Sequence, residues 1–279
     1  MPKVYPFDHP LGSACLKLKR ANIHIKGLRN SLLRCRSLHP EVAFSKKRKL
    51  EPPISIPGVL VEPAYIYELE IDPRIRESWA LIIGDILGNL RAGLDHVAWA
   101  LATEHARQQG RSLSAREARE VAFPLYESEA EFDRPGSPAQ RALRRILPTA
   151  HGTIRRFQPY GRANWPELEL LAILTDLTNA DKHRVVTPVL RQVDVRLGGE
   201  HLVTMRLNQP DKMMFLVTDG VAARMGHDLR PQATFDVVLH TAVRGRGFFS
   251  VSELPLIHSF IRHEVIPGFA SFFPGPRIT

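Results

Sequence analysis

A guanidinium and an imidazole lie five positions apart in this chain, at Arg91 and His96. A guanidinium stays charged, and its planar fork of N–H donors matches phosphate oxygens. An imidazole accepts or donates a proton near neutral pH. On a helix the two side chains would be about 140° apart, so they flank one cleft only where the helix edge faces a partner. Asp95, four positions after Arg91, is placed to form an ion pair with it.

Two polar stripes accompany this segment. Asp85 and Asn89 fall within about 40° of His96 on the same predicted helix. Asn179 and His183, four residues apart, end a later helix and lie beside leucines, so we expect its charged side chains to be desolvated and paired. The two stripes are predicted to face each other across a bundle. The candidate supporting residues are Asp85, Asn89, Asp95, Asn179, Asp181, Lys182 and His183.

Two long helices are predicted to position these residues. Apolar side chains recur at steps of three and four over residues 76–109, which predicts an amphipathic helix that carries Arg91 and His96. Residues 12–37 predict a first helix. It ends before His39-Pro40, because the residue preceding a proline is pushed out of the helical conformation.

Shorter elements complete the predicted bundle. Residues 137–157 are expected to be helical and basic, and a proline opens a further helix over residues 166–186. Prolines interrupt the chain near residues 54–72, where a short extended insertion is predicted. We therefore expect a helical bundle over residues 1–188.

From Val189 onward the apolar pattern changes to strict alternation, which is typical of strands. Leu197-Gly-Gly-Glu200 predicts a hairpin turn, and residues 253–273 predict a closing helix that is kinked near Pro267. Residues 189–279 are thus expected to form an antiparallel sheet and a C-terminal helix, packed on the bundle as one unit. The fold class is α+β: a helical bundle, a small antiparallel β-sheet and a C-terminal helix. Further strands are predicted at residues 65–71, 203–207, 213–218, 234–243 and 248–251.

The net charge of +9 over 279 residues is concentrated in two blocks. Residues 1–50 carry twelve Lys or Arg against two acids, and residues 134–162 carry seven Arg and no acid. Two basic blocks on an otherwise acidic chain indicate a local anion-binding surface, and a nucleic-acid backbone is the commonest partner of this kind. The run Lys46–Lys49 is predicted to form an exposed turn. The candidate RNA-binding residues are Arg144, Arg145, Arg155 and Arg156.

The segment Arg91-Ala-Gly-Leu-Asp-His96 resembles the Arg-x(4–6)-His signature of HEPN-type helical bundles, many of which are metal-independent ribonucleases. Phe123-Pro124, Gln158-Pro159-Tyr160 and the Asn-x-Asp-Lys-His-Arg segment starting at Asn179 extend a likeness to a group of bacterial proteins over roughly residues 76–190. The resemblance implies a homodimer with its active site at the interface and no cofactor. It also implies that Arg91 holds the scissile phosphate of RNA while His96 transfers a proton at the 2′-hydroxyl. A role in toxicity or defence, under an unknown protein regulator, would fit such an enzyme.

Two alternatives remain open from the residues alone. Buried Arg–Asp and Asn–His pairs often only set the register of packed helices, which would make the chain a non-catalytic interaction module. Asp85, His96, Asp176 and His183 could instead bind a divalent metal between helices, as in a metal-dependent hydrolase. No metal is the favoured expectation, because no Glu-x-x-His pair is present. With two cysteines, no apolar run long enough to span a bilayer and no secretory signal pattern, we expect a cytoplasmic protein without membrane contact.

Overall fold

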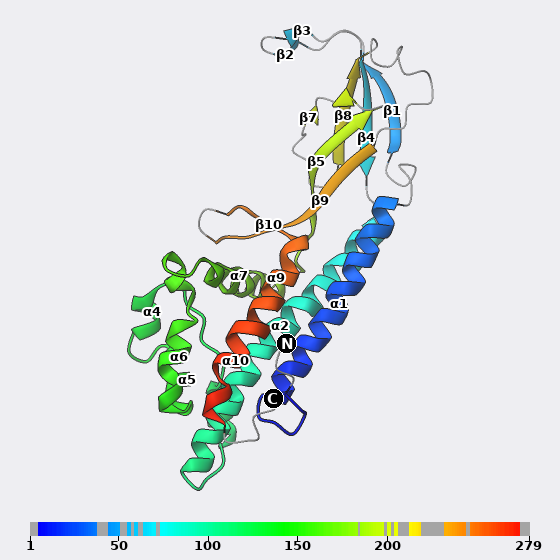
Figure 1. Ribbon diagram of the computed structural model, residues 1–279. Coiled ribbons are helices and arrows are strands. Elements are labelled where there is room, and N and C mark those ends of the chain that lie inside the picture. The colour runs from blue at the N-terminus through cyan, green and yellow to red at the C-terminus, as the bar shows by residue number, and fades with distance from the viewer. Residues whose placement is uncertain are drawn as a thin grey trace.

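Two long helices, α1 (Gly12–Ser37) and α2 (Pro73–Gln108), lie side by side and form the axis of the helical part (Figure 1). Both lie within three residues of their predicted bounds, so these two predictions are confirmed. The helices approach closely at Gly93. A β-carbon there would lie 3.1 Å from Cδ2 of Leu18, so a larger side chain would push α1 away.

This structure is a computed structural model. The residues it describes are 5–37, 44–50, 55–56, 59–60, 64–70, 73–183, 185–197, 200–201, 204–205, 212–218, 232–243 and 246–273.

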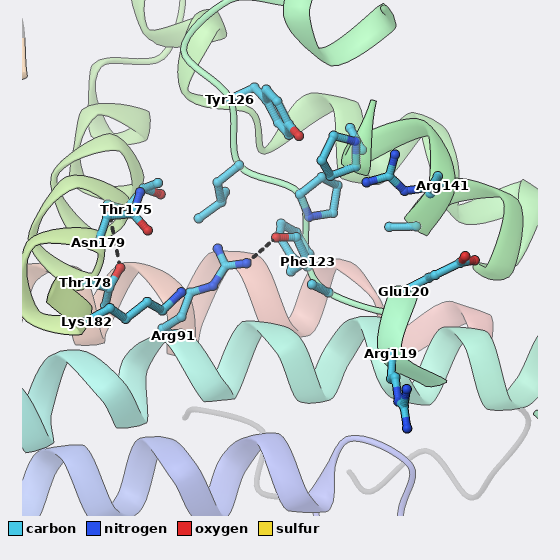
Figure 2. A pocket seen from close by; sticks show the side chains of 16 residues that line it. Arg91, Arg119, Glu120, Phe123, Tyr126, Arg141, Thr175, Thr178, Asn179 and Lys182 are labelled. Atoms are coloured by element: carbon cyan, nitrogen blue, oxygen red, sulfur yellow. Dashed lines mark hydrogen bonds between the residues drawn. The ribbon is translucent and has the colours of Figure 1, made fainter. Parts of the chain in front are cut away.

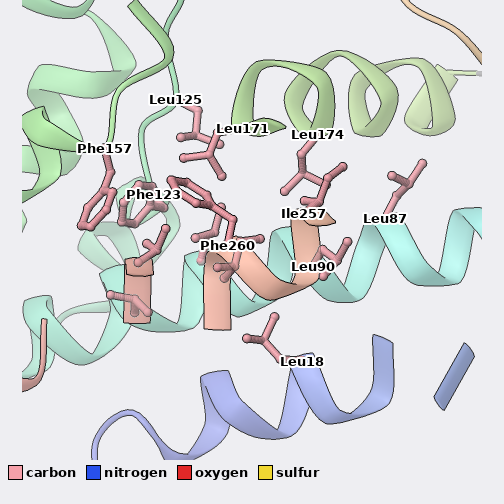
Figure 3. Close-up of a cluster of buried hydrophobic side chains, with 14 of the residues drawn as sticks. Leu18, Leu87, Leu90, Phe123, Leu125, Phe157, Leu171, Leu174, Ile257 and Phe260 are labelled. Atoms are coloured by element: carbon pink, nitrogen blue, oxygen red, sulfur yellow. The ribbon is translucent and has the colours of Figure 1, made fainter. Parts of the chain in front are cut away.

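Helices α7 (Glu169–His183) and α9 (Leu254–Phe260) pack on α1 and α2 and close one hydrophobic core. Figure 3 shows the side chains that meet there from α1, α2, α7, α9 and the loop around Phe123. After α9 the chain widens into a π-helical turn, residues 261–265, and continues as α10 (Ile266–Gly268). This break is the predicted kink, since Pro267 has no N–H to donate to the preceding turn.

Four short helices form the far side of the bundle: α3 (Ala115–Glu120), α4 (Glu129–Asp133), α5 (Pro138–Arg145) and α6 (His151–Arg156). Residues 137–157 were expected to be one helical stretch, but α5 ends at Arg145. Ile146 and Leu147, which precedes a proline, leave the helical conformation with ψ 147° and 120°. Serine caps start three of the four. Ser114 forms a capping box with Glu117, and Ser128 and Ser137 each accept a backbone N–H two or three residues along.

The strands lie beyond the ends of α1 and α2 and form two four-stranded antiparallel sheets (Figure 1). One has the order β1-β4-β8-β7 and the other β10-β9-β5-β6, and β2 and β3 form a separate pair. The predicted hairpin at Leu197–Glu200 is confirmed, because these two residues pair across β5 and β6. The strands are β1 (Phe44–Leu50), β2 (Ser55–Ile56), β3 (Val59–Leu60), β4 (Ala64–Glu70), β5 (Val189–Leu197), β6 (Glu200–His201), β7 (Thr204–Met205), β8 (Lys212–Thr218), β9 (Gln232–His240) and β10 (Phe248–Ser250).

The insertion between α1 and α2 belongs with these sheets. Strand β4 pairs with β8 from the C-terminal part of the chain, with Tyr67 opposite Phe215. A boundary at residue 188 therefore does not separate helices from strands. The prediction of an exposed turn at Lys46–Lys49 was wrong, because these residues are in β1, an edge strand. Charged side chains on an edge strand discourage pairing with other chains.

Within the described ranges, none of the helices combines the length and hydropathy that a bilayer-spanning segment needs.

Candidate functional site

The predicted ion pair between Arg91 and Asp95 is present, with 3.0 Å between Nη2 and Oδ1. Both side chains also bind the backbone of Phe123. Arg91 Nη2 donates to the Phe123 carbonyl at 2.6 Å, and the Phe123 N–H donates to Asp95 Oδ1 at 3.0 Å. The pair thereby satisfies both backbone polar groups of a fully buried residue. Helix α2 thus fixes the position of the loop that starts at Phe123.

Gln158 holds the same loop from the other side. Its Nε2 donates to the carbonyl of Pro124 at 2.8 Å, and its Oε1 accepts the N–H of Tyr126 at 3.1 Å. The Tyr126 carbonyl in turn accepts the N–H of Tyr160 at 3.2 Å. Three of the four sequence motifs named above, those around Arg91, Phe123 and Gln158, therefore meet at one loop, residues 123–126.

This loop forms one wall of a cavity of about 350 Å³. Figure 2 shows Arg91 and Lys182 at one side of the cavity and Arg141 across from them. Arg119 also lines it, as does one acid, Glu120, which binds Arg145 outside the lining at 2.9 Å. The cavity is therefore a concave space with an excess of positive charge. It is called the cationic cavity below.

His96 does not line the cationic cavity and lies on the side of α2 that faces α1. It is half-buried, and burial is the largest cause of a lowered pKa. The ammonium of Lys17 on α1 lowers this pKa further, and the Asp95 carboxylate opposes the shift. The neutral imidazole, which can accept a proton, therefore dominates at neutral pH. Within one chain, Arg91 and His96 point to different edges of α2, as their spacing predicts.

The outward face of α1 is cationic. The helix contains seven Lys or Arg and no acid. Lys19, Arg20, Lys26 and Arg29 are exposed, and none of them pairs with a carboxylate in the part of the chain that the structure describes. They occupy the middle of the helix over about 15 Å. These four residues are called the α1 cation row below. Lys17, whose charge lowers the pKa of His96, lies about 180° around α1 from Lys19 and Lys26, at the α1–α2 groove.

The residues of the second stripe separate in the structure. Asn179 and Lys182 line the cationic cavity, whereas Asp181 packs on α2, where a β-carbon at Gly84 would lie 3.0 Å from its Oδ1. His183 is exposed at the end of α7. Asp176 accepts hydrogen bonds at 2.8 Å from the Thr241 hydroxyl and the Ala242 N–H, which ties α7 to the end of β9.

In the first stripe, Asn89 bonds its own helix, since its Nδ2 donates to the Asp85 carbonyl at 2.7 Å. The Asp85 side chain is exposed. Neither residue lines the cationic cavity. The structure therefore does not bring the two polar stripes together as one set across the bundle.

The four candidate RNA-binding arginines differ in their surroundings. Arg145 binds Glu117 and Glu120, each at 2.9 Å. Arg155 binds Glu129 and Asp133. The guanidinium of Arg156 lies 5.3 Å from the centre of the Trp165 ring, a cation–π contact. Arg144 is exposed and has no partner among the described residues.

Within the described ranges, no group of three or more His, Cys, Asp and Glu side chains is arranged to hold a metal ion. Asp176 and His96, two of the four residues considered for a metal, face different elements, β9 and α1.

Sequence reasoning did not single out Arg119, Arg141 or the loop wall as parts of a site. Arg141 belongs to the second basic block, so the sequence showed its charge. The sequence did not show that α5 packs beside Pro124. The signal available in the sequence was three motifs that lie far apart, around Arg91, Phe123 and Gln158. Side chains that bind the backbone of a loop bring such distant segments together.

No protein-family model, curated protein or solved structure matches this chain.

Proposed function

We propose that this chain binds RNA along the α1 cation row. The observation that carries the proposal is that Lys19, Arg20, Lys26 and Arg29 of α1 are exposed and have no carboxylate partner among the described residues, so their charge is available to a polyanion. Binding of phosphates to such a row releases counterions, which is the main source of affinity for nucleic acids. Lys17 lies on the same helix near His96, so a phosphate bound at Lys17 would lie near a neutral imidazole.

The test compares two triple variants that remove the same charge. Lys19, Lys26 and Arg29 are replaced by Gln in one, and the exposed Arg116, Arg119 and Arg134 in the other. Binding to a fluorescein-labelled single-stranded RNA is measured by fluorescence anisotropy. We expect the α1 variant to lose roughly tenfold or more in affinity and the control to lose much less. Equal losses in both would reject the α1 cation row as the binding site.

Metal-independent RNA cleavage is the second candidate, and the state of His96 favours it. A partly exposed imidazole with a lowered pKa can accept the proton of a ribose 2′-hydroxyl. Since Arg91 of the same chain lies on the other edge of α2, the phosphate-binding guanidinium would come from a second copy, as the HEPN resemblance implies. Between the two edges α2 exposes Leu81 and Trp99, which are 66% and 45% accessible. Parallel packing of two copies along this strip would place Arg91 beside the partner's His96, offset by about 7.5 Å along the helix.

A mixing experiment tests this arrangement. RNA cleavage is measured in EDTA for wild type, His96→Ala, Arg91→Gln and an equimolar mixture of the two variants. If each site combines Arg91 and His96 from different copies, both variants are inactive and the mixture recovers about a quarter of the wild-type rate. No recovery would exclude a shared site. Cleavage that EDTA abolishes would support a metal-dependent hydrolase. If wild type does not cleave RNA and Arg91→Gln has a lowered Tm, the role of Arg91 is only to hold the loop at Phe123.

A further inference from the structure

The cationic cavity lies on the opposite side of α2 from the α1 cation row, so RNA bound along α1 would not fill it (Figure 2). Arg119 and Glu120 line it as well, but the cations that a ligand could bridge stand at two places. Arg91 and Lys182 come from α2 and α7 on one side, and Arg141 comes from α5 across from them. A ligand that used both sides would need an anionic group at each end.

Arg91 lies deep in the cationic cavity. Its side chain is only 19% exposed, so a group must enter the cavity to reach it. Its contacts with Phe123 and Asp95 both use Nη2. The guanidinium is therefore held in a fixed orientation, while Nη1 and Nε have no partner among the described residues. A fixed, partly free guanidinium is well suited to bind a phosphate.

Between the two charged sides part of the lining is apolar, and Thr175 and Asn179 of α7 add polar side chains. Phe123, Pro124 and Leu125 form one wall, and Pro138, Ala139 and Ala142 of α5 form another. The backbone of the loop adds little polarity, because Arg91, Asp95 and Gln158 already bind its N–H and carbonyl groups. A volume of about 350 Å³ is at the small end of the range for small-molecule pockets. The site therefore suits a compact organic molecule with an apolar or aromatic body.

We propose that the cationic cavity binds a small organic bisphosphate, with one phosphate at Arg91 and Lys182, the second at Arg141, and the organic body against the loop wall. A nucleoside bisphosphate has this chemistry. The site is separate from the RNA contacts proposed on α1 and does not depend on them, but it shares Arg91 with the cleavage site considered above.

The test is a titration series by isothermal calorimetry with inorganic phosphate, phenyl phosphate, adenosine 5′-monophosphate and adenosine 3′,5′-bisphosphate. Affinity is expected to rise along the series, with the bisphosphate bound about tenfold more tightly than the monophosphate. Arg141→Gln should remove that tenfold difference and leave binding of the monophosphate unchanged. Lys182→Gln should weaken both nucleotides. Arg144→Gln, on the same helix as Arg141 but outside the cavity, is the matched control and should change neither.

Three results would overturn the proposal: no binding of the bisphosphate, the same affinity for inorganic phosphate and the bisphosphate, or equal losses in Arg141→Gln and Arg144→Gln. Arg141, Arg144 and Lys182 are all exposed, so these variants are expected to fold, and a thermal melt of each checks this. The triple α1 variant should bind the bisphosphate as wild type does. Failure of RNA binding and failure of this proposal are therefore distinguishable.

Discussion

The two basic regions of this chain look alike in sequence and differ in the structure. Four cations of α1, Lys19, Arg20, Lys26 and Arg29, are exposed without carboxylate partners among the described residues. In the region of α3 to α6, Arg145, Arg155 and Arg162 each bind at least one carboxylate. Their partners come from residues 117–133, just before the second basic block. A block of cations without an acid can thus be neutralised by an acidic segment that adjoins it.

Basic residues therefore have different roles in the two regions. A partly buried arginine between two carboxylates contributes to the packing of short helices, and its removal leaves acids without a partner. An exposed, unpaired lysine contributes little to the fold and remains free for an external anion. The predictions below test this contrast.

The largest effect is expected at Arg145. Its guanidinium joins α5 to both Glu117 and Glu120 of α3, and all three side chains are at most 30% exposed. Arg145→Ala leaves two carboxylates close together, so we expect Tm to fall by roughly 3–6 °C. Arg144→Ala, the adjacent exposed position, is the control and should change Tm by less than about 2 °C. Similar shifts in both variants would contradict a packing role for Arg145.

The next prediction concerns the salt dependence of RNA binding. A plot of log affinity against log salt concentration has a slope set by the number of neutralised phosphates. Removing Lys19, Lys26 and Arg29 together should reduce the magnitude of this slope by about 2, because each phosphate contact on a single strand contributes about 0.7. Replacing Arg145, Arg155 and Arg162 by Gln should leave the slope unchanged, since these cations are already paired. An equal change in both variants would show that the pairs open to bind RNA.

The local elements could be predicted from the sequence because they depend on local patterns. Apolar spacing located α1 and α2, and Gly198-Gly199 located the hairpin at Leu197–Glu200. The pairing of β4 with β8 could not be predicted, because it joins strands about 150 residues apart and no short-range pattern specifies that register. Pro148 was visible in the sequence, and its effect on the preceding residue divides the predicted helix over residues 137–157 into α5 and α6.

Part of the candidate site was predictable for the same reason. The i,i+4 spacing predicted the Arg91–Asp95 pair, and the five-residue spacing predicted the separation of Arg91 from His96 around α2. It could not show that the pair binds the backbone of Phe123, because that contact spans 32 residues along the chain. Nor could charge counts show which arginines find carboxylates, since ion pairing depends on how α3, α4, α5 and α6 fold together.

Acid should weaken the contact between α3 and α5 only at low pH. The backbone N–H and hydroxyl of Ser114, followed by Arg111, lower the pKa of Glu117 from 4.5 to about 2. Because the folded-state pKa is below the unfolded value, ionised Glu117 stabilises the fold above pH 4.5, and this contribution is lost as the pH falls from 4.5 towards 2. Glu117→Gln lacks it at every pH. The Tm curves of wild type and Glu117→Gln should therefore differ at neutral pH and converge towards pH 2. Glu167→Gln changes an exposed glutamate and is the control. Its curve of Tm against pH should run parallel to that of wild type.

The smallest effect is expected at Arg155, and it separates pairing from burial. Arg155 binds Glu129 and Asp133, as Arg145 binds two acids, but the Arg155 and Asp133 side chains are 43% and 44% exposed. Water and salt screen such a pair, so Arg155→Gln should lower Tm by less than about 2 °C. Its RNA affinity should stay within about twofold of wild type, because the α1 cation row is intact. A loss of Tm as large as that of Arg145→Ala would mean that the number of partners, rather than their burial, decides what an arginine contributes in this region. A loss of RNA affinity would instead place part of the RNA contact on α6, beside Arg156.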